Sequence, residues 1–126
     1  MLNIERVNLE LNDKDYFGNA QQDLFENILT DNNLDPLDEY VKDNDRVNML
    51  ESVYDVLNML SNDIDKFRRV ETEFVTTSAA YQYLQKRLRD LRAEIDRVKL
   101  ETAYTDEQGN TSSIIGHLYF NSATKE

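Results

Sequence analysis

Residues 77–99 read TSAAYQYLQKRLRDLRAEIDRVK, and this stretch decides the fold that we expect for the chain. Large apolar side chains recur along it at steps of three and four, which is the spacing of one helix face. These are Tyr81, Leu84, Leu88, Leu91, Ile95 and Val98. Thr77 or Ser78 can cap the start of the helix. Because opposite charges do not flank the row regularly, the pattern favours a row packed inside its own helical bundle over a free coiled-coil dimer.

The charge of the chain is unevenly distributed along the sequence. Residues 1–65 hold 4 basic and 16 acidic side chains, whereas residues 66–104 hold 9 basic and 6 acidic ones. The total net charge of −11 argues against a protein that grips DNA or RNA, because that binding energy comes from neutralising phosphates. An acidic half and a mildly basic half favour contact between unlike faces of neighbouring copies. The sequence leaves an alternative open, in which the acidic and the basic half are both simply exposed to solvent.

Three further helices are expected before residue 77. Residues 3–11 fit a short helix, although their alternation also allows a strand, and residues 20–31 fit a second helix. A third helix is expected from about residue 43 to residue 60, and residues 61–76 form a connection with one helical turn at 64–68. Asn3 is the expected cap of the first helix, and Asp43 or Asn44 that of the third. The inward side chains of the third helix are Val47, Leu50, Tyr54, Leu57 and Leu60, with Val53 and Val56 widening the stripe.

The sequence changes character after Tyr104. Residues 105–110, TDEQGN, predict a turn, and SSIIGHLYFN at 112–121 is apolar and favours extended structure. We therefore expect a helical domain at 1–104 and a C-terminal arm at 105–126. The arm either folds back as an edge strand or lid, or docks on a partner. Its expected anchors at a partner interface are Ile114, Ile115, Leu118, Tyr119 and Phe120.

The expected fold class is therefore all-α: a bundle of about four helices with a long C-terminal helix, followed by an extended or β-like arm. With 126 residues, three glycines and one proline, the composition is that of one helix-rich domain. The first 13 residues, MLNIERVNLELND, lack the cationic and then apolar pattern of a signal peptide, and no apolar run approaches the ~18 residues of a membrane span. We expect a protein that is made and used on the cytosolic side, without membrane contact.

Catalytic, cofactor and metal sites are not predicted. The chain has no cysteine, and its single histidine, His117, lies among apolar residues with no second ligand of that kind. Residues 31–42 resemble a calcium loop only superficially, because Pro36 replaces the turn glycine and Lys42 replaces the bidentate glutamate. The sequence thus predicts a protein that is not an enzyme.

Several basic side chains are candidates for contact with the acidic surface of a neighbouring subunit. Phosphate binding is the alternative, and the large excess of acid in the chain favours ion pairing between subunits. These candidates are Lys66, Arg68, Arg69, Arg87 and Arg89.

The layout of the chain resembles a known family. A short N-terminal helix and an acidic loop precede RVNMLESVYDVLNMLSND at 46–63, and a connection with basic residues leads to TTSAAYQYLQKRLRDLRAEI at 76–95. The TSAA opening of the long helix and its YQYL continuation carry the likeness most directly. Over roughly residues 2–100, the chain resembles the small helical head–tail connector proteins of tailed bacteriophages, also called head completion or adaptor proteins.

The resemblance implies a structural virion protein made in the host cytoplasm and located in the neck of the particle. Such proteins form a ring, typically a dodecamer, beneath the portal protein, and the ring extends the DNA channel and joins the capsid to the tail. The implied partners are the portal protein, neighbouring copies and a downstream neck or tail-completion protein. DNA passes through without specific binding. The alternative function is a small acidic regulatory binding protein that mimics DNA or inhibits a basic partner.

Overall fold

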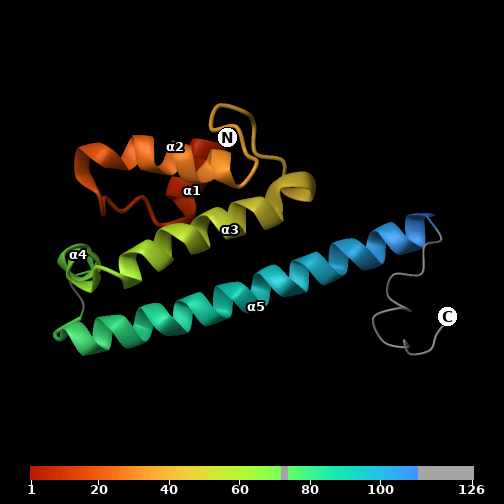
Figure 1. Cartoon of the computed structure of the whole chain (residues 1–126). Helices are drawn as coiled ribbons and strands as arrows, with labels where there is room; N and C mark the ends of the chain where they lie inside the picture. Colours follow the sequence, from red (N-terminus) through yellow and green to blue (C-terminus); the bar gives the residue numbers. More distant parts are fainter. Residues whose placement is uncertain (72–73, 111–126) are drawn as a thin grey trace. The chain divides into compact units, whose positions relative to one another are not determined.

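A computed structural model describes residues 1–71 and 74–110, with side chains as far as residue 103. This part of the chain is helical, which confirms the all-α class for the residues concerned (Figure 1). Its elements are α1 (Asn3–Glu10), the 3-10 turn η1 (Gly18–Ala20), α2 (Gln21–Asp31), α3 (Lys42–Ser61), α4 (Ile64–Val70) and α5 (Thr77–Asn110). The extended or β-like arm lies mostly at 111–126, outside the described residues, and stays a prediction.

The chain divides into two compact units, Met1–Ala93 and Glu94–Glu126. The helix α5 begins in the first unit and ends in the second. The first unit contains the core and the surfaces that bear on function.

Helix α3 is the central element of the first unit. It packs against α1, α2 and α4, and its buried side chains share one core with Ala80, Leu84 and Leu88 of α5. In Figure 1, α3 lies between the α1–α2 layer and the first half of α5. The fully or almost fully buried apolar side chains of α3 are Met49, Leu50, Val53, Val56, Leu57 and Leu60. Val47 and Tyr54, expected inside, are only half-buried. Contact on more than one side explains why the buried stripe is wider than the predicted row.

Three predicted helix caps are wrong. At the start of α5, Thr76 takes the place expected for Thr77 or Ser78, since its hydroxyl accepts a 3.0 Å hydrogen bond from the Ala79 N–H. Asn3 is the first residue of α1, and its buried side-chain amide donates a 2.8 Å hydrogen bond to the carbonyl of Asp35. This bond joins α1 to the α2–α3 connection. Helix α3 begins at Lys42, and the Val41 N–H donates to the carboxylate of Asp45 at 2.9 Å. Asp43 and Asn44 therefore lie inside the first turn of α3, where the negative charge of Asp43 still interacts favourably with the helix dipole.

An aromatic cluster surrounds α4. The Asp63 carboxylate accepts a hydrogen bond from the Lys66 N–H and caps this helix, which extends the expected helical turn by two residues. Phe67 is fully buried. Its ring lies 5.9 Å from that of Tyr16, 6.1 Å from that of Phe74 and 6.3 Å from that of Tyr83. The cluster holds α4 and the start of α5 together.

The apolar row of α5 is displaced by one residue at its start. Tyr81, expected in the core, exposes 46% of its surface, and Ala80 is fully buried instead. Positions 80 and 81 lie four and three residues before Leu84, so the spacing alone cannot choose between them. Leu84, Leu88 and Ile95 are buried, and Leu91 and Val98 are half-buried.

The end of α5 also differs from the expectation. The helix continues through residues 105–110 to Asn110, where the sequence predicted a turn. Residues 105–108 include no proline, so nothing in them breaks the helix, and Gly109 and Asn110 are residue types that commonly end one.

Candidate functional site

Two of the five predicted basic contacts are used inside the first unit. Arg68 donates to the carbonyl of Phe74 at 3.4 Å, to the Thr77 hydroxyl at 3.3 Å and to the carbonyl of Val75. Arg87 donates to the carbonyl of Glu10 at 3.3 Å. Arg68 therefore fixes the α4–α5 connection, and Arg87 joins α5 to α1.

The other three differ in their availability to a partner. Lys66 is half-buried, with its ammonium 5.5 Å from the centre of the Phe17 ring. Arg69 and Arg89 are exposed, and no ion pair or hydrogen bond engages either side chain among residues 1–71 and 74–103. Within the described part of the chain, Arg69 and Arg89 are the two members of the predicted set without such a partner, and both can meet an external carboxylate.

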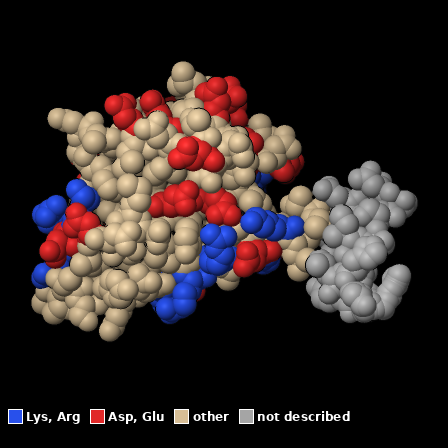
Figure 2. Space-filling model, viewed as in Figure 1, with Lys and Arg blue, Asp and Glu red and all other residues tan. Residues whose placement is uncertain are grey.

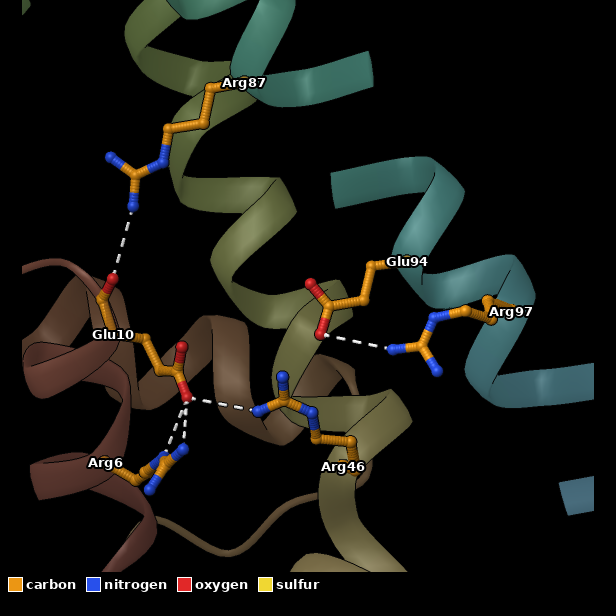
Figure 3. A network of polar contacts seen from close by, with 6 residues as sticks. All are labelled: Arg6, Glu10, Arg46, Arg87, Glu94 and Arg97. Carbon is orange, nitrogen blue, oxygen red and sulfur yellow. Dashed lines mark hydrogen bonds and ion pairs between the residues drawn. The ribbon is translucent and has the colours of Figure 1, made fainter. Parts of the chain in front are cut away.

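Glu10 is the centre of a polar network that joins α1 to α3 (Figure 3). Its carboxylate accepts from Arg6 at 2.6 Å and from Arg46 at 3.4 Å. In the second unit, Figure 3 also shows Arg97 pairing with Glu94 at 3.9 Å along α5. Charge in these places stabilises the helices and their packing.

Tyr16 and Glu71 form a buried polar pair. The Tyr16 side chain is only 4% exposed, and its hydroxyl donates to the Glu71 carboxylate at 2.6 Å. Burial first, and then the bond to Glu71, raise the pKa of Tyr16 above its ordinary value. The ammonium of Lys14 lies 3.9 Å from the same carboxylate. The pair ties the α1–α2 connection to the end of α4.

A shallow pocket of about 300 Å³ opens between α3 and α5, and we call it the α3–α5 pocket. Its lining consists of Tyr54 and Asn58 from α3 and of Gln85, Leu88, Arg89 and Arg92 from α5. The Arg92 guanidinium lies 4.5 Å from the centre of the Tyr54 ring and donates to both carboxylate oxygens of Glu51, at 3.1 and 3.3 Å. The pocket therefore combines one apolar side chain, a fixed aromatic–arginine stack and the exposed cation of Arg89.

Sequence reasoning did not find this pocket. It placed Tyr54 in the core and treated Arg89 only as one of several surface charges. The available signal was the position of Tyr54 and Tyr81 at the margins of their apolar rows, where an aromatic ring can be half-exposed.

A second surface feature is the segment that connects α2 to α3. Residues 35–41 run beside the first residues of the chain, with hydrogen bonds from the Asn3 N–H to the Asp38 carbonyl at 2.8 Å and from the Tyr40 N–H to the Met1 carbonyl at 2.9 Å. Leu37 is 69% exposed. Asp35, Asp38 and Glu39 flank it and are all exposed. We call residues 35–41 the acidic loop.

Within the described helices, no segment has the length and apolar character needed to cross a membrane. In the same part of the chain, no group of three or more acidic or histidine side chains could hold a metal ion. The predicted arm anchors are Ile114, Ile115, Leu118, Tyr119 and Phe120, and they lie outside the described residues, as does His117. Comparison of the chain with protein-family models, with curated protein sequences and with solved structures gives no match.

Proposed function

We propose that this chain is a structural head–tail connector of a tailed bacteriophage, which assembles as a ring beneath the portal protein. The observation that carries the proposal is the separation of charge on the first unit. Figure 2 shows mainly carboxylates over the part of this face where α1, α2 and the α2–α3 connection lie. Lysine and arginine side chains, together with some carboxylates, lie around α4 and farther down the view. The sequence itself places 16 of the 25 acidic residues before residue 66.

Separated charge suits a cyclic assembly. In a ring, each subunit uses two different surfaces, because the front of one copy meets the back of the next. An acidic surface and a surface with free arginines complement each other in such a contact and repel the wrong pairing. Excess carboxylates that line a channel would also repel the phosphates of DNA and let the duplex pass.

In this proposal the C-terminal arm attaches the ring to the portal. The apolar side chains of residues 114–120 are of the types that form the centre of protein interfaces. The helix α5 ends at Asn110, a few residues before these anchors in the sequence.

The test is to mix the purified full chain with the portal protein of the same virus and to measure mass by size-exclusion chromatography with light scattering. The proposal expects the chain to elute with the portal ring as a larger complex. A portal that elutes without the chain at every concentration tested would contradict it. One-to-one binding to a basic nuclease or repressor instead would support the acidic regulatory protein.

A further inference from the structure

The α3–α5 pocket places apolar surface beside an exposed cation. Leu88, which is 5% exposed, contributes apolar surface, and Tyr54 adds an aromatic face that is held in place by Arg92. Arg89 supplies a cation that has no partner in the described part of the chain. The pocket is shallow and lies at the lower end of the volume range for small-molecule sites, which favours a side chain presented from another protein surface.

The acidic loop presents such a side chain. Leu37 is more exposed than Leu9 or Leu100, the other exposed leucines described, and Asp38 follows it directly. The Asp35 carboxylate accepts a 2.9 Å hydrogen bond from the Leu37 N–H, and Glu39 accepts one from the amino group of Met1, so both of these acids already have partners. Asp38 has no side-chain partner among the described residues and is free to pair with a cation.

We propose that the acidic loop of one copy docks into the α3–α5 pocket of a second copy, with Leu37 against Leu88 and Tyr54 and with Asp38 paired to Arg89. The inference deepens the proposed function and rests on it for the closed ring. Its carrying arguments are the match of charge between Asp38 and Arg89 and the match of the exposed Leu37 to the Leu88 and Tyr54 side chains in the pocket lining.

The acidic loop that docks must belong to a second copy, because the loop cannot reach the α3–α5 pocket of its own chain. Backbone bonds hold the loop to the first residues of α1, including one from the Ile4 N–H to the Pro36 carbonyl at 3.0 Å. Figure 1 shows α1 and the α2–α3 connection on the side of α3 opposite to the first half of α5. The same bonds fix the loop in shape, so docking orders few additional residues.

This contact uses a different surface on each copy, so it continues from subunit to subunit. One leucine in a shallow pocket covers far less than the ~800 Å² per partner of a stable interface. We therefore expect weak association of isolated copies and stronger association where a portal ring holds many copies side by side.

A cysteine cross-linking experiment tests the contact, since the chain has no cysteine of its own. One preparation carries Glu39→Cys, beside Leu37, and the other carries Asn58→Cys, at the exposed rim of the pocket. A short bis-maleimide reagent is added to the mixture, with and without portal protein, and the products are identified by mass spectrometry. Gln22→Cys, exposed on α2, replaces Glu39→Cys in the control mixture.

The proposal expects the Glu39→Cys and Asn58→Cys pair to form severalfold more product than either protein with itself or than the Gln22→Cys control. Adding Leu37→Asp to the loop partner should reduce the yield to the control level, whereas Leu9→Asp, at another exposed leucine, should not. Arg89→Glu in the pocket partner should lower the yield severalfold, and Asp38→Arg in the loop partner should restore it. Arg69→Glu is the matched charge control.

The proposed contact between the acidic loop and the α3–α5 pocket would be overturned by either of two results. One is a cross-linking yield equal to that of the Gln22→Cys control both with and without portal protein, and the other is a yield that Leu37→Asp does not change. Portal binding without the cross-linked product would keep the connector role and remove this inference. Cross-linking without portal binding would keep the contact and remove the connector role.

Discussion

Tyr16 shows how a single residue can carry both packing and polar stabilisation in this protein. Its ring stacks on Phe67, and its hydroxyl donates to Glu71 from a site that is almost fully buried. Burial and the adjacent carboxylate raise the pKa of Tyr16, because both disfavour the phenolate. The neutral phenol is therefore the form that the fold stabilises.

This arrangement predicts a loss of stability at alkaline pH. In the unfolded chain Tyr16 ionises near its ordinary pKa of ~10, while the folded chain still holds the proton. The stabilisation is fully present below that pH and is lost as the pH rises above it. Tyr16→Phe should lower the free energy of unfolding by about 1–3 kcal/mol at pH 7, because Glu71 loses its donor.

Urea unfolding at neutral and alkaline pH measures this effect. The difference in stability between the wild type and Tyr16→Phe should shrink as the pH rises. A constant difference at all pH values would show that the hydroxyl titrates as in the unfolded chain.

The face of α5 that enters the core gives a second prediction at this scale. Leu84→Ala should cost about 2–5 kcal/mol of unfolding free energy, because Leu84 is fully buried. Tyr81→Ala should change it by less than about 0.5 kcal/mol, because that side chain is largely outside the core. Thermal or chemical unfolding measures the free energy of unfolding of both variants. A larger loss of stability for Tyr81→Ala than for Leu84→Ala would mean that Tyr81 lies in the core, as its spacing predicted.

The row at 81–98 shows what sequence could and could not provide at single residues. The 3–4 spacing identifies Leu84 and Leu88 correctly, because both lie in the middle of the apolar stripe. The spacing fails for Tyr81, and for Tyr54 of α3, because both residues lie at the lateral edge of the buried face of their helix. At such an edge the polar hydroxyl of the ring tolerates water. Whether such a residue is buried depends on neighbouring helices that the local pattern does not contain.

At the scale of elements, the helices were predictable and their ends were less so. Apolar spacing and turn residues placed α2, α3 and the start of α5 to within a few residues. The caps failed for two reasons. Asn3 bonds to the distant Asp35 carbonyl. At α3 and α5, Asp45 and Thr76 accept the local hydrogen bonds instead of the expected residues. The turn expected at residues 105–110 also failed, since a long helix that is already formed adds residues at little cost.

The connection between α4 and α5 allows a prediction about two neighbouring arginines, one of which serves as the control for the other. Arg68 holds carbonyls of this connection, while its neighbour Arg69 is exposed and has no side-chain partner among the described residues. Arg68→Ala should lower the free energy of unfolding by about 1–3 kcal/mol, because the carbonyls of Phe74 and Val75 lose a charged donor. Arg69→Ala should have an effect within about 0.5 kcal/mol.

Hydrogen exchange locates the effect of Arg68→Ala. Amides of α4 and of the first turn of α5 should exchange faster in this variant than in Arg69→Ala, while those of α2 should be unchanged. Equal exchange in both variants would mean that Arg68 does not hold the connection.

At the scale of the whole molecule, the sequence anticipated the distribution of charge but not the surfaces that it forms. The counts of acid and base follow from composition alone. The α3–α5 pocket could not be predicted, because it depends on how two helices distant in the sequence bring Tyr54, Leu88 and Arg89 together. The acidic loop looked like a solvated loop, and only its bonds to α1 show that it holds Leu37 outward in a fixed form.

The arm gives a prediction that separates attachment from folding. Deletion of residues 111–126 removes all five expected anchors and leaves α5 at its full length. We expect helix content by circular dichroism to be unchanged and binding to the portal protein to be lost. Deletion of residues 122–126, which keeps the anchors, should preserve binding to the portal protein. A loss of helix content on deletion of residues 111–126 would mean that the arm belongs to the core of its own domain.

The central claim is that this helical protein works as a subunit of a ring held on a portal. Native mass spectrometry of the complex between the full chain and the portal protein tests it most directly, because it counts the copies of each. The account predicts one fixed stoichiometry with many copies of the chain per portal ring, and no series of partly filled states at saturation. A single bound copy, a broad range of occupancies at saturation, or no complex would contradict it.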